Sequence, residues 1–480
     1  MLEQRNYLRH DLTALYAFIE SIVEGVVSQR NSTAYSPAAI RFLDFVHALA
    51  ASCKKHLANW RVQDDEEFED RREELGTIRA AWRELHKLIK PALDADTLQV
   101  PSAVVDGIVR RFQEIHGYHE TEFVLLHTAE FNYVQIRTAD LRNLSAKIRA
   151  IIPDSPEFPT NLGVIGMPYS QGRTAFANCL VAHEMGHFVY RDKTFESSLQ
   201  TAADTALKSV FENYEGQSQE QKDRLIRCVA RWAEELFCDL FGVMLLGPCY
   251  TFAYIEAYDL SAVLDSAGAI SEERMQPRME FYEYHPSHIF RLQQQSVFLR
   301  ESHWWDHICK SQARFSTLLQ LLRCIETDAH VAQNPTVGRL VPALSAIVPE
   351  IRKAAFTAFE EVDDGFALFS QLNRFVRDYL AAGVVPSTLN IRISNDTDDV
   401  VAVSAPPLVL LNSGMEFYLT RTDELIRSIQ GEDQNQFDCR LRWIRRIEEW
   451  VAKAIEDESL EKEETHVDPV KNGDPEAPRP

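Results

Sequence analysis

The stretch "CLVAHEMGHFVYRD", residues 179–192, places two histidines and a glutamate within five positions of an otherwise apolar segment. Its apolar spacing predicts a helix over about 173–190. On a helix, His183 and His187 lie one turn apart on the same face, and Glu184 is turned by about 100° from His183. A buried charge costs several kcal/mol unless it is paired or binds a metal. The stretch therefore raises the question of whether a metal ion compensates these side chains.

The composition indicates a globular protein with an acidic surface. A chain of 480 residues predicts two or three subdomains, and a net charge of -22 disfavours nucleic-acid binding, which requires clustered Lys and Arg. The first residues show no secretory signal, and the longest uncharged run, 240–255, is too short for a membrane span. The eight cysteines form no CxxC pair. We therefore expect a cytoplasmic protein with reduced thiols and no membrane span.

The periodicity of the chain predicts an α+β fold that is predominantly helical. Short strands are expected in "EFVLLHT", "NYVQIR" and "NLGVIGMPYSQG", ahead of the motif helix, and a second strong helix over about 222–246. Further helices are expected over about 287–382 and 420–455. The predicted regions are a helical N-terminal region (1–116), a core (117–300), a helical C-terminal region with a β-hairpin near 387–404 (301–455), and a disordered acidic tail (456–480).

The pattern His183-Glu184-x-x-His187 is typical of a zinc-hydrolase helix, on which the histidines bind the metal and the glutamate is the general base. Zinc needs a third protein ligand, which the segment "AEELFCD" supplies as Glu235. Asp239 follows one turn later, where its carboxylate can accept the second ring N–H of a ligating histidine. Glu234 remains a competing ligand. Cys179 and Cys238 are expected to be small core residues.

A third element, "YHPSHIFRL", follows at residues 284–292. The motifs HExxH, ExxxD and HPSxxxR, in this order over about 160–295, resemble those of the HtpX and CaaX-prenyl-protease family of gluzincin metallopeptidases. Because no convincing membrane span is present, the chain resembles the soluble members of that group.

The resemblance implies a zincin-like peptidase core with one Zn²⁺ per chain. It implies metal ligation by His183, His187 and Glu235, with Asp239 behind a ligating histidine. It also implies that Glu184 is the base, that His285 is a donor near the oxyanion, and that Arg291 anchors either the loop or the substrate.

Several features leave alternatives open. Pro286 disfavours helix at His285, and Ser287 is a plausible cap for the next helix, so His288 is expected on that helix's surface or in a substrate pocket, as a rival to His285. The segment "HWWDH" (303–307) repeats the histidine spacing without a glutamate and is expected to pack aromatic residues. The strand "GVIGMPY" is a candidate sheet edge on which an extended substrate could pair.

These features together predict a zinc-dependent peptidase that hydrolyses peptide bonds through a metal-activated water, with Glu184 as general base and a peptide or protein as substrate. Two alternatives remain: a non-catalytic zinc-binding regulatory or scaffold protein on a peptidase fold, and a peptidase effector activated by a partner. An intact Glu184, which has no structural duty on this helix, favours the enzyme.

Overall fold

A computed structural model of the chain describes most of its length. The described residues are 2–30, 37–59, 66–93, 103–128, 134–136, 138–168, 174–192, 195–210, 216, 218–258, 285–310, 335–360, 362–363, 365–392, 400–429 and 436–466.

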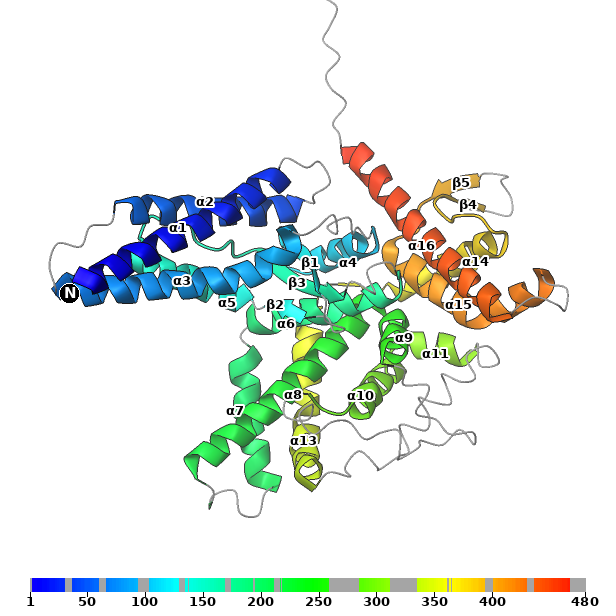
Figure 1. The fold of residues 1–480 in the computed structure, drawn as a ribbon. Helices are drawn as coiled ribbons and strands as arrows, with labels where there is room; N and C mark the ends of the chain where they lie inside the picture. Colours follow the sequence, from blue (N-terminus) through cyan, green and yellow to red (C-terminus); the bar gives the residue numbers. More distant parts are fainter. Residues whose placement is uncertain are drawn as a thin grey trace, which may run out of the picture.

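The fold is predominantly helical around a small three-stranded sheet, as the sequence predicts (Figure 1). Strand β1 (Glu122–Thr128) pairs in parallel with β3 (Leu162–Pro168), and β2 (Val134–Ile136) pairs antiparallel with the other side of β3. The order β1-β3-β2 therefore places β3 in the middle. The strand predicted as a sheet edge for substrate pairing is paired on both sides, so that prediction is wrong.

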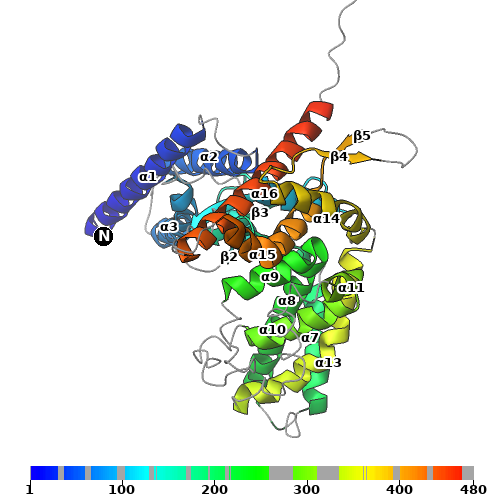
Figure 2. The same ribbon diagram turned by 90° about the vertical axis from the view of Figure 1, so that its right-hand side faces the viewer.

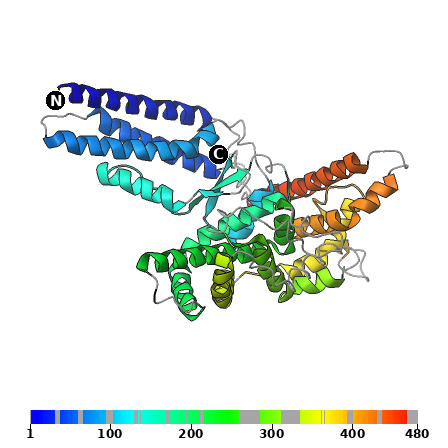
Figure 3. The same ribbon diagram turned by 60° about the horizontal axis from the view of Figure 1, so that its bottom comes forward.

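One face of this sheet is covered by an N-terminal bundle, drawn in blue and cyan in Figure 3. Successive side chains of a strand point to opposite faces, so Val124 and Val164 join the bundle core, whereas Phe123 and Ile165 join a second core on the other face. The helices of the bundle are α1 (Leu2–Arg30), α2 (Pro37–Ala58), α3 (Glu66–Leu93) and α5 (Thr138–Ile151).

The second core lies on the other face of the sheet and extends from Val104 to Ile455. It includes α4, which precedes the boundary predicted at 116, and it continues without a break past the boundary predicted at 300. Its helices are α4 (Ala103–Gln113), the 3-10 helix η1 (Ala177–Leu180), α6 (Val181–Asp192), α7 (Phe195–Val210), α8 (Gln219–Leu246), α9 (Pro248–Ala257), α10 (His288–Arg300), α11 (His303–Lys310), α13 (Pro335–Ala358), α14 (Phe366–Ala381), α15 (Pro407–Ile429) and α16 (Gln436–His466).

The C-terminal region contains the expected hairpin, β4 (Leu389–Arg392) antiparallel to β5 (Val400–Val403), whose turn lies outside the described residues. The single helix predicted over 420–455 is instead two helices, α15 and α16, which lie side by side (Figure 2).

The prediction of disorder from residue 456 is wrong as far as His466, because α16 continues to that residue. This last part of the helix packs against the core: Glu458 is 2% exposed, and Arg110 donates to it from Nη2 over 2.9 Å. Residues 467–480 lie outside the described residues.

The uncharged run 240–255 is a helix end followed by a turn, as expected. Helix α8 ends at Leu246, Gly247 adopts a φ of 66° that favours glycine, and Pro248 opens α9. Within the described parts of the chain, no helix is both long and apolar enough to cross a membrane.

Candidate metal centre

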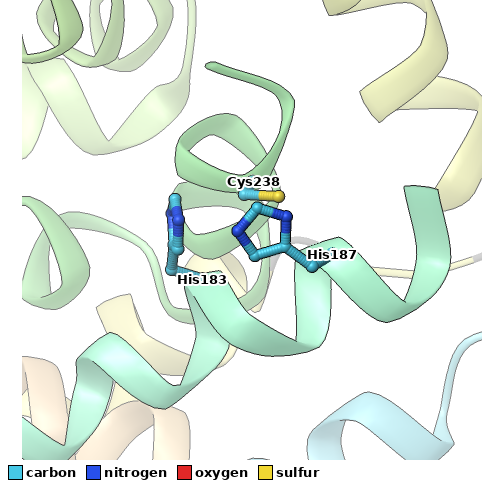
Figure 4. A group of neighbouring side chains, drawn as sticks. All are labelled: His183, His187 and Cys238. Atoms are coloured by element: carbon cyan, nitrogen blue, oxygen red, sulfur yellow. The ribbon is translucent and has the colours of Figure 1, made fainter. Parts of the chain in front are cut away.

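The two helices that carry the sequence motifs, α6 and α8, pack directly against each other. A Cβ on Gly186 of α6 would lie 2.9 Å from the Cα of Cys238 on α8, so only glycine permits this approach. The close crossing brings His183 and His187 towards α8 (Figure 4). One donor atom from each histidine and the sulfur of Cys238 all lie within 4.8 Å of one another, so the group could hold a metal ion.

The inner nitrogens of both histidines face one carboxylate. His183 Nε2 lies 3.3 Å from Oε2 of Glu235, and His187 Nε2 lies 3.6 Å from Oε1 of the same residue. The two rings are nearly perpendicular, at 88°, with centroids 4.9 Å apart. Glu235 is 7% exposed. The structure thus brings together the three side chains for which the sequence predicts metal ligation.

The outer nitrogens of the two histidines are each held by a different acid. His183 Nδ1 lies 3.0 Å from Oδ1 of Asp239, the contact predicted for that aspartate. His187 Nδ1 lies 2.9 Å from Oε1 of Glu234, which also accepts a hydrogen bond from Arg191 Nη2 over 2.8 Å. Glu234, the competing ligand in the sequence, therefore faces the outer side of His187.

Arg291 of α10 forms ion pairs with two acids of α8. Its Nε and Nη2 donate to the two carboxylate oxygens of Asp239 over 2.7 and 2.8 Å, and its Nη1 lies 3.1 Å from Oε2 of Glu235. The arginine is 4% exposed. Of the two roles implied for Arg291, this geometry supports the anchor of the loop.

The segment before α10 adopts the predicted form. Ser287 caps α10 by accepting a hydrogen bond from the Phe290 N–H over 3.2 Å, so His288 is the first residue of the helix. His285 Nδ1 lies 3.1 Å from Oε2 of Glu235, and 37% of the His285 side chain is exposed. His285 therefore borders the metal centre and remains partly open to solvent.

His288 does not lie on an open helix surface. Its Nδ1 is hydrogen-bonded to the Tyr254 hydroxyl over 2.7 Å, and its ring centroid lies 4.1 Å from that of Tyr258. Burial, followed by the nearby charge of Arg291, lowers the pKa of His288 to about 3. The imidazole is therefore neutral near neutral pH.

Two tyrosines of α9, and the tyrosine that follows its last residue, are contributors to the site that the sequence analysis missed. Tyr250 donates to Oδ1 of Asp239 over 2.8 Å, Tyr254 holds His288, and Tyr258 packs against the same histidine. The signal was present in "YTFAYIEAY", residues 250–258, because a spacing of four places all three rings on one helix face.

The electrostatics of the centre favour a cation. Burial by itself lowers the pKa of His183, but hydrogen bonds and charges from Asp239 and Glu235 outweigh it and raise the pKa to about 10. Burial by itself raises the pKa of Glu235, but Arg291 and His183 outweigh it and hold that pKa well below its ordinary value. The acids are therefore ionised, and they draw a proton onto His183.

The net charge of the group also matches the charge of one divalent ion. Metal ligation requires His183 to release its proton. The group then contains two guanidinium groups, Arg191 and Arg291, and four carboxylates, an excess of two negative charges that one divalent cation would neutralise. The carboxylates are those of Glu184, Glu234, Glu235 and Asp239.

Burial, followed by the surrounding carboxylates, raises the pKa of the Cys238 thiol well above its ordinary value, so without a metal the sulfur is a protonated core group, as the sequence predicts. Glu184 is 6% exposed, and it makes no hydrogen bond or ion pair to any other described residue. Unlike the other three carboxylates of the group, that of Glu184 is therefore not held by another described residue.

Among the described residues, the second histidine pair of the sequence forms no shared site. The His303 ring stacks on Phe366 at 5.9 Å, and His307 Nε2 lies 2.9 Å from Oε2 of the buried Glu416. As expected for "HWWDH", this helix packs aromatic residues: Trp304 is 4% exposed and lies against Phe369 at 4.7 Å.

Comparisons of the chain with protein-family models, with curated proteins and with solved structures find no match. Any functional assignment therefore depends on the residues of the site.

Proposed function

We propose that the chain is a zinc-dependent peptidase of gluzincin type, with a zincin-like core formed by the small sheet, α6 and α8. The observation that carries the proposal is that the two nitrogens of each imidazole have different partners. Both Nδ1 atoms are held by acids, whereas both Nε2 atoms face Glu235. A ligating histidine needs this arrangement, because the hydrogen bond at one nitrogen fixes the lone pair on the other.

His183, His187 and Glu235 are the ligand set that we favour. The sulfur of Cys238 is near enough to be an alternative, but the Glu235 carboxylate lies opposite both inner nitrogens at once. Two histidines and one carboxylate also leave a fourth position of a tetrahedral zinc ion for a water or a substrate, as catalytic zinc sites do.

A bound zinc ion would polarise a peptide carbonyl and lower the pKa of a water molecule to about 7. Glu184 is the general base, because its carboxylate is buried beside the histidines and is not engaged by another described residue. It accepts the proton of the attacking water and transfers it to the leaving amine. His285 borders Glu235 and is partly exposed, which suits a donor to the carbonyl oxygen.

An extended substrate would pair with β2. Among the described strands, the sheet order places β2 at an edge, antiparallel to β3, and β2 also contacts α6, which carries the histidines. Backbone pairing at a sheet edge lays a peptide in extended form along a strand. This geometry would align a scissile peptide bond with the metal centre.

The experiment that tests the proposal compares cells that make the wild-type protein with cells that make Glu184→Gln. The variant keeps side-chain size and zinc but cannot accept the proton, so the cleavage products found with wild type should disappear. Glu220→Gln is the matched control, because this residue is exposed in the first turn of α8. A cellular phenotype that persists unchanged in Glu184→Gln, with no lost cleavage product, would favour the scaffold alternative.

A further inference from the structure

The partners behind the two histidines differ in how they are held. Asp239, behind His183, is fully buried and receives hydrogen bonds from Arg291 of α10 and Tyr250 of α9. The side chain of Glu234, behind His187, is 17% exposed and is held only by residues of α6 among its described contacts. His187 and Arg191 are one helical turn apart, and Glu234 bridges them from α8.

We infer that Glu234, held by Arg191, is a positioning residue that presents His187 to the metal. The inference rests on the metal centre proposed above. A neutral imidazole carries one N–H, and a carboxylate 2.9 Å from Nδ1 selects the form protonated there. The lone pair of Nε2 is then directed at Glu235, where the ion would bind. Glu234 faces the outer nitrogen of His187, on the side away from Glu235, so it would act on the ion through His187.

Arg191 fixes the orientation of the Glu234 carboxylate towards His187. Its Nη2 and the Nδ1 of His187 share a single oxygen, Oε1 of Glu234, so the arginine holds the carboxylate on the side of the histidine. Without Arg191, the partly exposed Glu234 side chain is free to turn towards solvent. We therefore expect a large effect from Glu234→Ala, a smaller one from Glu234→Gln, whose amide oxygen still accepts from Nδ1, and a small one from Arg191→Gln.

The first test needs no metal. Nitrogen NMR of the metal-free full chain with ¹⁵N-labelled histidine rings reports which ring nitrogen carries the proton, and a His187→Ala spectrum identifies the signals of His187. Nδ1 of His187 should carry a proton in the wild type and in Glu234→Gln, because each offers an oxygen acceptor at that nitrogen. The preference should be lost in Glu234→Ala and kept in the control Glu220→Ala. A wild-type His187 with no proton on Nδ1 would overturn the inference.

The second test measures the Zn²⁺ dissociation constant by competition with a chelator. Glu234→Ala should weaken zinc binding by about 10- to 100-fold, whereas Glu235→Ala should lose most of it. Glu234→Gln should recover part of the lost affinity, whereas Glu234→Met, which restores most of the packing but offers no oxygen acceptor, should bind zinc as weakly as Glu234→Ala. Unchanged zinc affinity in Glu234→Ala would overturn the inference, and so would zinc that is retained by Glu235→Ala but lost by Glu234→Ala. Wild-type protein that binds no zinc would instead contradict the proposed function, while the NMR result would still decide the role of Glu234.

Discussion

The two faces of the central sheet differ in how far their ion pairs are exposed to solvent. On the side of the N-terminal bundle, ion pairs remain in contact with solvent: the side chains of Arg79 and Asp11 are 28% and 24% exposed. On the other side, Arg291 and Asp239 are paired with their side chains 4% and 1% exposed. The bundle is stabilised by its apolar core, whereas the second core encloses a cluster of charges.

The difference matters because solvent-exposed and buried ion pairs have different energies. An exposed pair contributes about 0–1 kcal/mol, since water screens it. A buried pair costs several kcal/mol per ion in lost hydration, which the attraction between the ions only partly offsets. A chain that encloses this many charges beside two histidines gains little stability from them, which supports the metal centre proposed above.

The largest expected effect is on metal content. Purified wild-type protein should carry about one zinc ion per chain, and His183→Ala or Glu235→Ala should lose most of it, because structural zinc binding in small domains is worth about 10–16 kcal/mol and depends on every ligand. Arg79→Ala, on the bundle side, should keep it. Elemental analysis measures the content. Zinc retained by Glu235→Ala and lost by Cys238→Ala would show that the thiol is the third ligand.

The next effect is on stability. Arg291→Ala leaves Asp239 and Glu235 buried without their guanidinium partner and should lower the free energy of unfolding by about 3–5 kcal/mol. Arg79→Ala removes an exposed pair and should cost at most about 1 kcal/mol. Urea denaturation of metal-free protein compares the two variants. Equal losses would mean that the two faces of the sheet do not differ in the way that their ion pairs suggest.

The third effect concerns the two histidines of the loop before α10. If His285 donates to the carbonyl oxygen in the transition state, His285→Ala should raise the barrier by about 2.7–4 kcal/mol, roughly a hundred- to thousandfold in kcat, and should keep its zinc. His288, held between Tyr254 and Tyr258, should matter less, and His288→Ala should lower kcat by under about tenfold. The rates are measured on a peptide taken from the cleavage products, and the reverse ranking would contradict the assignment.

A fourth effect is a dependence of stability on pH, located in the second core. Burial, together with the charge of Glu256, raises the pKa of Glu448 to about 7, although the Phe176 N–H donates to its Oε1 over 3.4 Å. Because the folded pKa lies above the ordinary value, the stabilising contribution is complete below about pH 4.5 and is lost as the pH rises through about 7.

Glu448→Gln should remove this dependence and raise the free energy of unfolding at about pH 8 by on the order of 2 kcal/mol. The neighbouring Glu449 is exposed, so Glu449→Gln is the matched control and should change little. Urea denaturation at several pH values measures the difference between variant and wild type. A difference that does not change between about pH 5 and pH 8 would rule out a raised pKa at Glu448.

The parts of the site that were predictable from the sequence are those fixed within one helix. The period of 3.6 residues places His183 and His187 on one face of α6, and Glu235 and Asp239 on one face of α8, without knowledge of any other element. The choice between Glu234 and Glu235 as the metal ligand, by contrast, depends on the packing of two helices. Adjacent residues are turned by about 100° from each other, so the crossing of α6 and α8 decides which one faces the inner nitrogens.

Long-range pairing accounts for the predictions that were wrong. The apolar run of β3 is compatible with an edge or a central strand, and only its pairing with both β1 and β2 makes it central. The end of α16 has the composition of a solvated tail, but Glu458 finds its partner in Arg110, 348 positions earlier in the chain. Neither partner can be identified from the residues near it.

The smallest expected effect separates the two parts of that predicted tail. Deletion of 467–480 removes no contact that the structure describes and should change the free energy of unfolding by less than about 0.5 kcal/mol. Deletion of 456–480 also removes Glu458, which leaves Arg110 without its carboxylate partner, and Asp457, which accepts a hydrogen bond from Ser387. This longer deletion should cost about 1–3 kcal/mol, since it breaks a largely buried charge-assisted hydrogen bond and exposes the surface beneath the helix. Thermal and urea unfolding of the two truncated chains measure both values. Equal stability of the two would mean that the end of α16 adds nothing to the second core, and a large loss from the shorter deletion would mean that residues 467–480 themselves pack against the protein.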